Sequence, residues 1–261
     1  MGIIEAILIA IIEGLTEFLP VSSTGHMIIT EKLLHVPETD FTKLFTVAIQ
    51  LGAILAVVVL YFRKFVDFSR WQFYLKLVIA VIPAIILGAL FSSKIDAMLE
   101  SSTTVAVTLL LGGVLFLMID NYFKAPTISR EEDISNRKGF LIGVWQCIAM
   151  IPGVSRSAAS IIGGMQQGLT RKLAAEFSFF LAVPTMAAAT GYKLLKGYHT
   201  FTSEHVKILL VGNAVAFLVA ILAIRFFIGF LQKHGFRLFG YYRIVLGVIL
   251  ILLILSGYLP K

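Results

Sequence analysis

The sequence predicts an all-α polytopic membrane protein with six transmembrane helices, two broken re-entrant helical hairpins and two inverted-topology repeats. Of the 261 residues, 58% are hydrophobic and only 14% are charged, and the mean hydropathy is +0.92, so one soluble core could not bury the apolar surface. The apolar segments reach about twenty residues, enough for a helix to cross about 30 Å of hydrocarbon. They lack the alternation of barrel strands, and breaks rich in polar residues recur about half a chain apart.

The first broken segment lies at the N-terminus. Residues 3–18 form an apolar helix, which Pro20 should interrupt because proline lacks the amide hydrogen of the helical ladder. A half-helix then begins at the hydroxyl residues 22–24, which suit an N-cap, and continues to about Leu34. The segment is too short for two spans, and irregular backbone at membrane depth survives only inside protein or beside a wet cavity. We therefore expect a re-entrant hairpin.

A polar linker divides the chain into two similar halves. A second broken segment, 139–170, is interrupted at Pro152-Gly153. The six expected spans lie at about 44–62, 77–93, 104–123, 174–195, 206–230 and 239–258, with a basic loop from Arg63 to Lys76. We predict a single membrane domain, 1–261, made of repeat 1 (about 1–123), a linker (about 124–138) and repeat 2 (about 139–261). Corresponding broken segments in two halves indicate a site near the membrane midplane.

The basic residues predict the orientation. One hairpin and three crossings in each half would invert the second half, and 13 Lys and Arg residues then fall on the linker side against seven on the other. The positive-inside rule places the linker in the cytoplasm and both termini outside. The formal charge of +7 is distributed in short clusters between spans, which does not favour nucleic acid as a partner. The single cysteine excludes an intrachain disulfide, and Met1 is expected to begin the mature chain.

Two carboxylates stand inside the first apolar helix. Glu13 and Glu17 are four residues apart, so they share a helix face and can converge on one ligand. Because ionised groups are costly at this depth, they should have a partner: a divalent cation such as Mg²⁺ or Ca²⁺, an arginine, or a shared proton. Alternatively, both carboxylates lie at the interfacial end of the helix and meet water.

Ser22, Ser23, Thr24 and His26 directly follow the first break, where a half-helix start offers unpaired amide hydrogens and a positive dipole end. This is a candidate phosphate-binding site. Ser23 and His26 could form a nucleophile–base pair or bind phosphate. The alternatives are that the serines only cap the helix and that His26 is an ordinary buried histidine.

The second break carries a cation between two hydroxyls, Ser155, Arg156 and Ser157. A guanidinium in a broken membrane segment is costly unless it binds an anion, and its planar fork matches phosphate oxygens. The alternative is an ion pair with Glu13 or Glu17 that only holds the hairpins together. Arg243 and Glu176 lie near span ends, where we expect interfacial pairing or a side chain that reaches the surface.

These stretches resemble the bacterial undecaprenyl-diphosphate phosphatase family, also called the bacitracin-resistance family. The sequences that carry the resemblance are EGLTEFLPVSSTGH at 13–26, PGVSRS at 152–157 and FSFFLAVP at 177–184. Ser160 stands where the family usually has threonine, which exchanges one hydroxyl for another.

The resemblance implies a membrane hydrolase that converts undecaprenyl diphosphate to undecaprenyl phosphate and inorganic phosphate. It implies recycling of the lipid carrier for peptidoglycan synthesis and bacitracin resistance. Glu17, Ser23, His26 and Arg156 would be catalytic, with Glu13 and Glu17 binding the metal. The phosphate would be bound by Arg156 together with the remaining hydroxyls, namely Ser22, Thr24, Ser155 and Ser157.

The competing hypothesis is a transporter or flippase of a polyprenyl phosphate, because inverted repeats with broken helices are also a transporter architecture. The residues alone do not choose between Ser23, His26 and water as the nucleophile. The resemblance implies a multi-pass protein of the bacterial inner membrane whose site opens to the outer, periplasmic face. The Gly112-Gly113 pair weakly indicates close helix packing and leaves a homodimer open.

Overall fold

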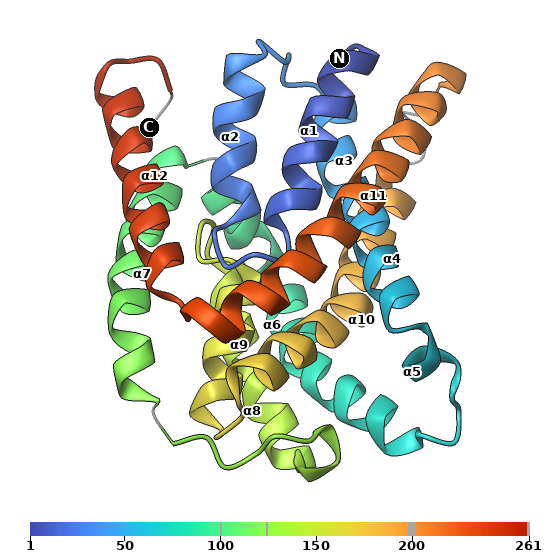
Figure 1. Ribbon diagram of the computed structural model, residues 1–261. Helices are drawn as coiled ribbons and strands as arrows, with labels where there is room; N and C mark the ends of the chain where they lie inside the picture. Colours follow the sequence, from blue (N-terminus) through green and yellow to red (C-terminus); the bar gives the residue numbers. More distant parts are fainter. Residues whose placement is uncertain (100, 124, 198–201, 260–261) are drawn as a thin grey trace.

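The computed structural model describes residues 1–99, 101–123, 125–197 and 202–259, and its elements are almost entirely helical. Figure 1 shows one bundle in which the helices run mainly along a common direction. The first half contains α1 (Ile3–Thr16), α2 (Ser23–Leu33), α3 (Asp40–Ala48), α4 (Gln50–Leu60), α5 (Phe62–Val66), α6 (Trp71–Leu99) and α7 (Ser102–Tyr122). The second contains α8 (Asn136–Cys147), α9 (Arg156–Gln166), α10 (Arg171–Gly197), α11 (Ser203–His234) and α12 (Arg237–Leu255), with 3-10 helices η1 (Glu131–Asp133) and η2 (Ile148–Met150).

Six segments of the described chain are long and apolar enough to span a membrane, as the sequence predicts. They are Asp40–Leu60, Trp71–Ile95, Ser102–Tyr122, Arg171–Lys196, Ser203–His234 and Arg237–Leu255. The first combines α3 and α4, which meet at a turn. There the amide of Gly52 donates to the Asn213 side chain on α11 (2.7 Å), so a polar side chain compensates the break in the helical ladder. The all-α polytopic fold is confirmed.

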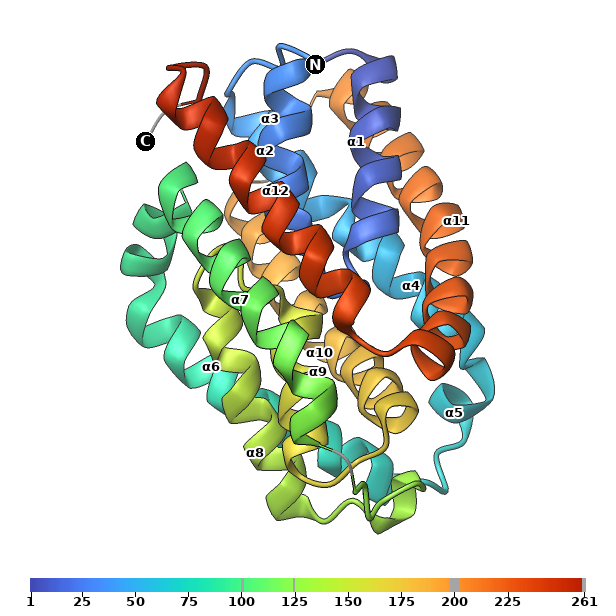
Figure 2. The same ribbon diagram turned by 60° about the vertical axis from the view of Figure 1, so that its left-hand side comes forward.

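The two predicted breaks are present, and each separates a pair of short helices. With 14 and 11 residues, α1 and α2 are about 21 and 17 Å long at 1.5 Å per residue, less than a hydrocarbon layer of about 30 Å. Figures 1 and 2 show α2 returning beside α1 from one end of the bundle, while α8 and α9 enter from the other. The tips meet, since the Ser157 hydroxyl donates to the Leu19 carbonyl (3.0 Å). Membrane re-entry by these hairpins stays a prediction.

The same backbone geometry recurs at both tips. Ser22 caps α2 with φ +70°, and Ser155 caps α9 with φ +75°, a left-handed conformation that is uncommon for serine. Each side-chain oxygen accepts an amide hydrogen of its 11-residue helix, from Gly25 in one case and Ala158 in the other. This likeness supports the predicted repeat, although the inverted topology itself stays a prediction. Strained backbone of this kind is typical of functional sites.

Helix α10 is the central helix of the bundle. Of the most apolar stretch of 18 residues in α10, 61% is buried inside the protein. The corresponding share in α6, which runs along the outside, is 28%. Phe177, Phe179 and Phe180 are completely buried, and Phe179 packs edge-on against Phe18 beside the first tip. The serine between these phenylalanines therefore faces a closely packed core.

The prediction of a basic loop at 63–76 is wrong, because α5 and the first turns of α6 occupy most of this segment. Lys76 is only 6% exposed, and its ammonium donates to the carbonyls of Glu131 and Glu132. The Glu131 carboxylate pairs with Lys64 (2.6 Å) and Arg70 (3.1 Å), so the linker is fixed to this helical segment. Two charges from the orientation count, Lys124 and Lys261, lie outside the described residues.

The close helix packing expected at Gly112-Gly113 occurs within the chain, between α7 and α12. A Cβ at Gly113 would meet Ile244 Cγ1 at 2.7 Å, and one at Gly112 would collide with the Arg243 guanidinium. The homodimer stays a prediction.

Candidate active site

An ion pair joins the two hairpin tips. Arg156, the first residue of α9, donates to Glu17 Oε1 at the end of α1 (3.0 Å). The side chains are 12% and 8% exposed, so water screens this attraction little. Of the two pairings left open above, the structure forms the one with Glu17.

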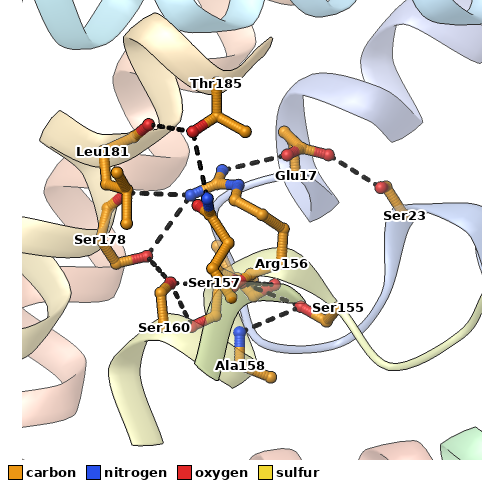
Figure 3. A network of polar contacts seen from close by, with 12 residues as sticks. Glu17, Ser23, Ser155, Arg156, Ser157, Ala158, Ser160, Ser178, Leu181 and Thr185 are labelled. Atoms are coloured by element: carbon orange, nitrogen blue, oxygen red, sulfur yellow. Dashed lines mark hydrogen bonds and ion pairs between the residues drawn. The ribbon is translucent and has the colours of Figure 1, made fainter. Parts of the chain in front are cut away.

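Figure 3 shows the guanidinium of Arg156 between Glu17 and α10. Its second terminal nitrogen donates to the Ser178 carbonyl (3.0 Å), and the Ser160 hydroxyl donates to the Ser178 hydroxyl (2.7 Å). The Nε atom of Arg156 is buried and has no hydrogen-bond partner among the described residues. The cation is therefore oriented by its neighbours while one of its donors stays unused.

The hydroxyl groups of the two tips are held in different ways. Ser23 donates to the second oxygen of Glu17 (2.8 Å), so Glu17 lies between Arg156 and Ser23 in Figure 3. Ser155 and Ser157 share a hydrogen bond of 3.0 Å, and Ser157 is completely buried. One carboxylate thus orders a hydroxyl of the first tip and the cation of the second.

Glu13 lies one turn before Glu17 and is 1% exposed, which excludes the alternative of an interfacial carboxylate in water. Its Oε1 atom is buried without a hydrogen-bond partner among the described residues. A buried carboxylate oxygen with no donor costs free energy, so this atom suits a proton or a hard cation with oxygen ligands. No group of three His, Cys, Asp or Glu that could hold a metal occurs in the described parts of the chain.

His26 is hydrogen-bonded at both ring nitrogens. Nδ1 lies 2.8 Å from the Ser22 carbonyl, and Nε2 lies 2.6 Å from the Tyr242 hydroxyl on α12. A carbonyl only accepts, so Nδ1 carries a proton. Burial to 9% exposure disfavours a second proton, which leaves the Nε2 lone pair to accept from the phenol. A Ser23–His26 nucleophile–base pair would require both side chains to exchange their present hydrogen bonds.

The expectation that the Arg243 side chain lies at the membrane interface is wrong. Arg243 is 1% exposed, and its guanidinium donates to four carbonyls rather than to a carboxylate. The acceptors are Pro20 of the first tip (3.3 Å), Gly153 (2.9 Å) and Val154 (3.1 Å) of the second, and Thr108 of α7 (3.2 Å). The breaks leave the carbonyls of Pro20, Gly153 and Val154 without helical partners, and one planar cation satisfies them while it also contacts α7.

The tertiary structure brings most of the expected site residues together. Glu17, Ser23 and Arg156 are directly hydrogen-bonded, while Ser22 contacts His26 through its carbonyl. The other candidates are placed less directly. Glu13 precedes Glu17 on α1, Thr24 is partly exposed at the start of α2, and Ser155 and Ser157 hold the second tip.

Three further residues of the site carried only weak sequence signals. Tyr242 and Arg243 lie in the last apolar span, where an internal arginine is a signal of function but a tyrosine is common near the membrane interface. Ser178 stands inside the phenylalanine-rich stretch that contributes to the family resemblance, but no spacing rule relates it to Arg156.

Comparisons with known proteins agree with these motifs. The family model described as bacitracin resistance protein BacA matches residues 6–249. A relative from Flavobacterium psychrophilum, named undecaprenyl-diphosphatase, is 60% identical over 97% of this chain and 96% of its own length. Proteins with the same name from Flavobacterium johnsoniae and Aquifex aeolicus are 55% and 45% identical, over 97% and 94% of this chain and 96% of each relative. With six apolar helices and both motifs in place, this multi-pass membrane protein belongs to the bacitracin resistance protein BacA family.

Proposed function

We propose that this protein hydrolyses undecaprenyl diphosphate to undecaprenyl phosphate and inorganic phosphate. The observation that carries the proposal is the buried Glu17–Arg156 pair between two strained serine-capped helix starts. It combines an anion-binding cation, helix N-termini and an acid in one place, which is the chemistry a diphosphate needs. The names of the relatives support the same substrate. The protein would recycle the lipid carrier for peptidoglycan synthesis and so confer bacitracin resistance.

The diphosphate would bind where Glu17 now meets Arg156. A phosphate oxygen can replace the carboxylate on the guanidinium and also use the unpartnered Nε, because the guanidinium fork matches two phosphate oxygens. The tips of both hairpins would then contribute amide hydrogens from the starts of α2 and α9. These groups stabilise negative charge that develops on the transferred phosphoryl group.

In the reaction a nucleophile attacks the terminal phosphorus, the bridging P–O bond breaks, and undecaprenyl phosphate leaves. Three routes fit the residues. His26 can attack through Nε2, it can accept a proton there from an attacking water, or Ser23 can attack after giving its proton to a base. The first and third form a covalent phosphoenzyme that water then hydrolyses. Radiolabel from the substrate trapped on His26 or Ser23 under rapid quench would identify either one, and its absence favours direct attack by water.

The site also fits a divalent cation, Mg²⁺ or Ca²⁺, held by Glu13 and Glu17. The unpartnered buried oxygen of Glu13 is the observation that supports this assignment. Two carboxylates are few for a metal site, but Mg²⁺ commonly combines one or two carboxylates with substrate phosphates and water. When bound, such a cation would neutralise phosphate charge and polarise a phosphoryl oxygen.

An apolar groove beside the second hairpin suits the polyprenyl tail. It has a volume of about 260 Å³ and lies between α7, α8, η2, α9 and α12. Leu111, Ile148 and Ala159 contribute apolar surface, and Arg243 lies among its lining residues. A tail in this groove would leave the diphosphate near the hairpin tips.

The proposal includes a cellular location. The protein would be in the bacterial inner membrane with the linker cytoplasmic and both termini outside, as the basic residues indicate. The site would open to the outer, periplasmic face. Accessibility of single cysteines introduced into the linker and near Ser256 would test this orientation in intact cells.

Phosphate release by the purified protein in detergent tests the function. We expect Mg²⁺- or Ca²⁺-dependent release from undecaprenyl diphosphate, and a loss of at least about 100-fold in both Arg156→Ala and Glu17→Gln. The first change removes the cation that stabilises phosphoryl charge, and the second removes one carboxylate of the proposed metal site. Arg237→Ala, which removes an exposed arginine at the start of α12, is the matched control. A folded wild-type protein that releases no phosphate but moves a labelled polyprenyl phosphate across vesicles would instead support the flippase hypothesis.

A further inference from the structure

We propose that Tyr242 is a positioning residue of the reaction. Its hydroxyl holds the His26 imidazole with Nε2 directed toward the substrate, and it gives up that hydrogen bond when a phosphate oxygen arrives. The inference rests on the proposed phosphatase function and adds a residue outside the three stretches that carry the family resemblance.

The contacts of His26 define the direction of its lone pair. The Ser22 carbonyl accepts from Nδ1 at 2.8 Å and the Tyr242 hydroxyl lies 2.6 Å from Nε2, so rotation of the ring would break two hydrogen bonds. The aromatic rings are also nearly parallel, at 9° with 5.5 Å between centroids. Ser22 itself is fixed by its left-handed backbone and its cap on α2. The imidazole is therefore held in one orientation and one tautomer, with Nε2 as the reactive nitrogen.

The exposure of the two rings places Tyr242 on the outer side of the histidine. Tyr242 is 48% exposed, whereas His26 is 9% exposed. A ligand that approaches Nε2 must therefore meet the phenol. A charged phosphate oxygen is a stronger acceptor than a neutral imidazole, so the phenol would turn its proton to the phosphate and release the Nε2 lone pair.

The position of Tyr242 is fixed by the residue that follows it. Arg243 donates to carbonyls of both hairpin tips, including Pro20 (3.3 Å) and Gly153 (2.9 Å). The first turns of α12 are thus tied to the same backbone that positions Ser22 and Arg156. Catalytic geometry is sensitive to displacements of about 1 Å, so a phenol anchored in this way can control the imidazole.

The simpler interpretation is that Tyr242 is one of the tyrosines that gather at membrane interfaces. Its neighbour Tyr241 provides the comparison, because it is 58% exposed on the same helix. If tyrosine served only the interface, loss of either hydroxyl would have the same small effect. If the phenol controls Nε2, only Tyr242→Phe should change the chemistry of His26.

Carbethoxylation of His26 by diethyl pyrocarbonate provides a test that does not require turnover. The reagent attacks an unprotonated ring nitrogen, and the phenol occupies that nitrogen in the wild type. We expect Tyr242→Phe to raise the modification rate of His26 at least about threefold, the size of one neutral hydrogen bond. The rate is measured by mass spectrometry of the His26 peptide, and Tyr241→Phe should match the wild type. An unchanged His26 rate in Tyr242→Phe overturns the proposal.

Kinetics and NMR complete the experiment. Tyr242→Phe should lower kcat roughly three- to tenfold with less than about a twofold change in KM, because an ill-positioned imidazole affects the chemical step more than binding. In ¹⁵N-histidine wild-type protein, His26 should show the tautomer protonated at Nδ1, and a shift pattern for protonated Nε2 refutes the geometry without any variant. If the wild type releases no phosphate, the proposed function fails, while the modification rates and the tautomer still decide the role of Tyr242.

Discussion

Replacement of Arg243 by methionine tests the link between the two hairpins. The change removes the guanidinium and keeps a long apolar side chain, while four carbonyl acceptors stay behind. The Thr108 carbonyl keeps its helical partner inside α7, so three carbonyls lose their donor. An unsatisfied buried carbonyl costs about 1–3 kcal/mol, so the three would cost roughly 3–6 kcal/mol toward the lower end of that range. Removing a buried cation without a carboxylate partner recovers several kcal/mol of desolvation. We expect a net loss of about 1–3 kcal/mol in the free energy of unfolding.

The effect on activity should be larger than the effect on stability. Both tips lose a shared anchor, and a displacement of about 1 Å between Arg156 and His26 would lower kcat by about 100-fold. Arg243→Lys keeps the charge but not the planar fork, so it should fall between wild type and Arg243→Met in both measurements.

The assays are unfolding by sodium dodecyl sulfate in mixed micelles, followed by tryptophan fluorescence, and phosphate release from the folded fraction. Arg237→Met is the matched control, because this arginine begins the same helix and is exposed. If Arg243→Met lies within about 0.5 kcal/mol of the wild type, the range of ordinary surface substitutions, and keeps full activity, then the four hydrogen bonds do not hold the site.

Three further predictions follow from single contacts. Gly153→Ala should destabilise the protein by more than about 2 kcal/mol, because the φ of Gly153 is +87° and a Cβ there would meet the Val105 carbonyl oxygen at 2.7 Å. Gly229→Ala, where a Cβ would meet open space, should not destabilise the protein. Equal effects of the two changes in the micelle titration would contradict this prediction. Glu131→Gln weakens two ion pairs that fix the linker, so limited proteolysis there should accelerate about tenfold while activity stays within about twofold; unchanged cleavage would exclude the role. Glu13→Gln should raise the Mg²⁺ concentration for half-maximal activity about tenfold or more, and an unaltered metal dependence would place the cation elsewhere.

Local patterns explain why the sequence predicts so much of this fold. The hydropathy of a span depends only on the composition of about twenty consecutive residues, so the sequence predicts all six spans. A proline interrupts the helical turn next to it, so the sequence also predicts both breaks. The sequence also predicts that Arg156 has a polar partner, because an uncompensated cation in an apolar segment is costly. Its pairing with Glu17 rather than Glu13 could not be predicted, since both carboxylates lie on one face of α1 and only packing of the tips separates them.

The basic segment at 63–76 shows where composition misleads. Charged residues indicate a loop, yet Lys76 is buried in α6 because the Glu131 and Glu132 carbonyls accept its hydrogens. Those acceptors lie in the linker, more than fifty residues away, so the local sequence around Lys76 does not reveal them.

The amino-acid sequence alone predicts a helical membrane protein with two polar breaks that carry acids, hydroxyls, an imidazole and a cation. These properties follow from residue chemistry and short-range spacing. The partner of His26 and the side chain that joins the two breaks depend on long-range packing, because Tyr242 lies 216 residues from His26 and Arg243 lies 223 residues from Pro20. Contacts at that separation depend on how α12 packs against both hairpin tips, which no local pattern encodes.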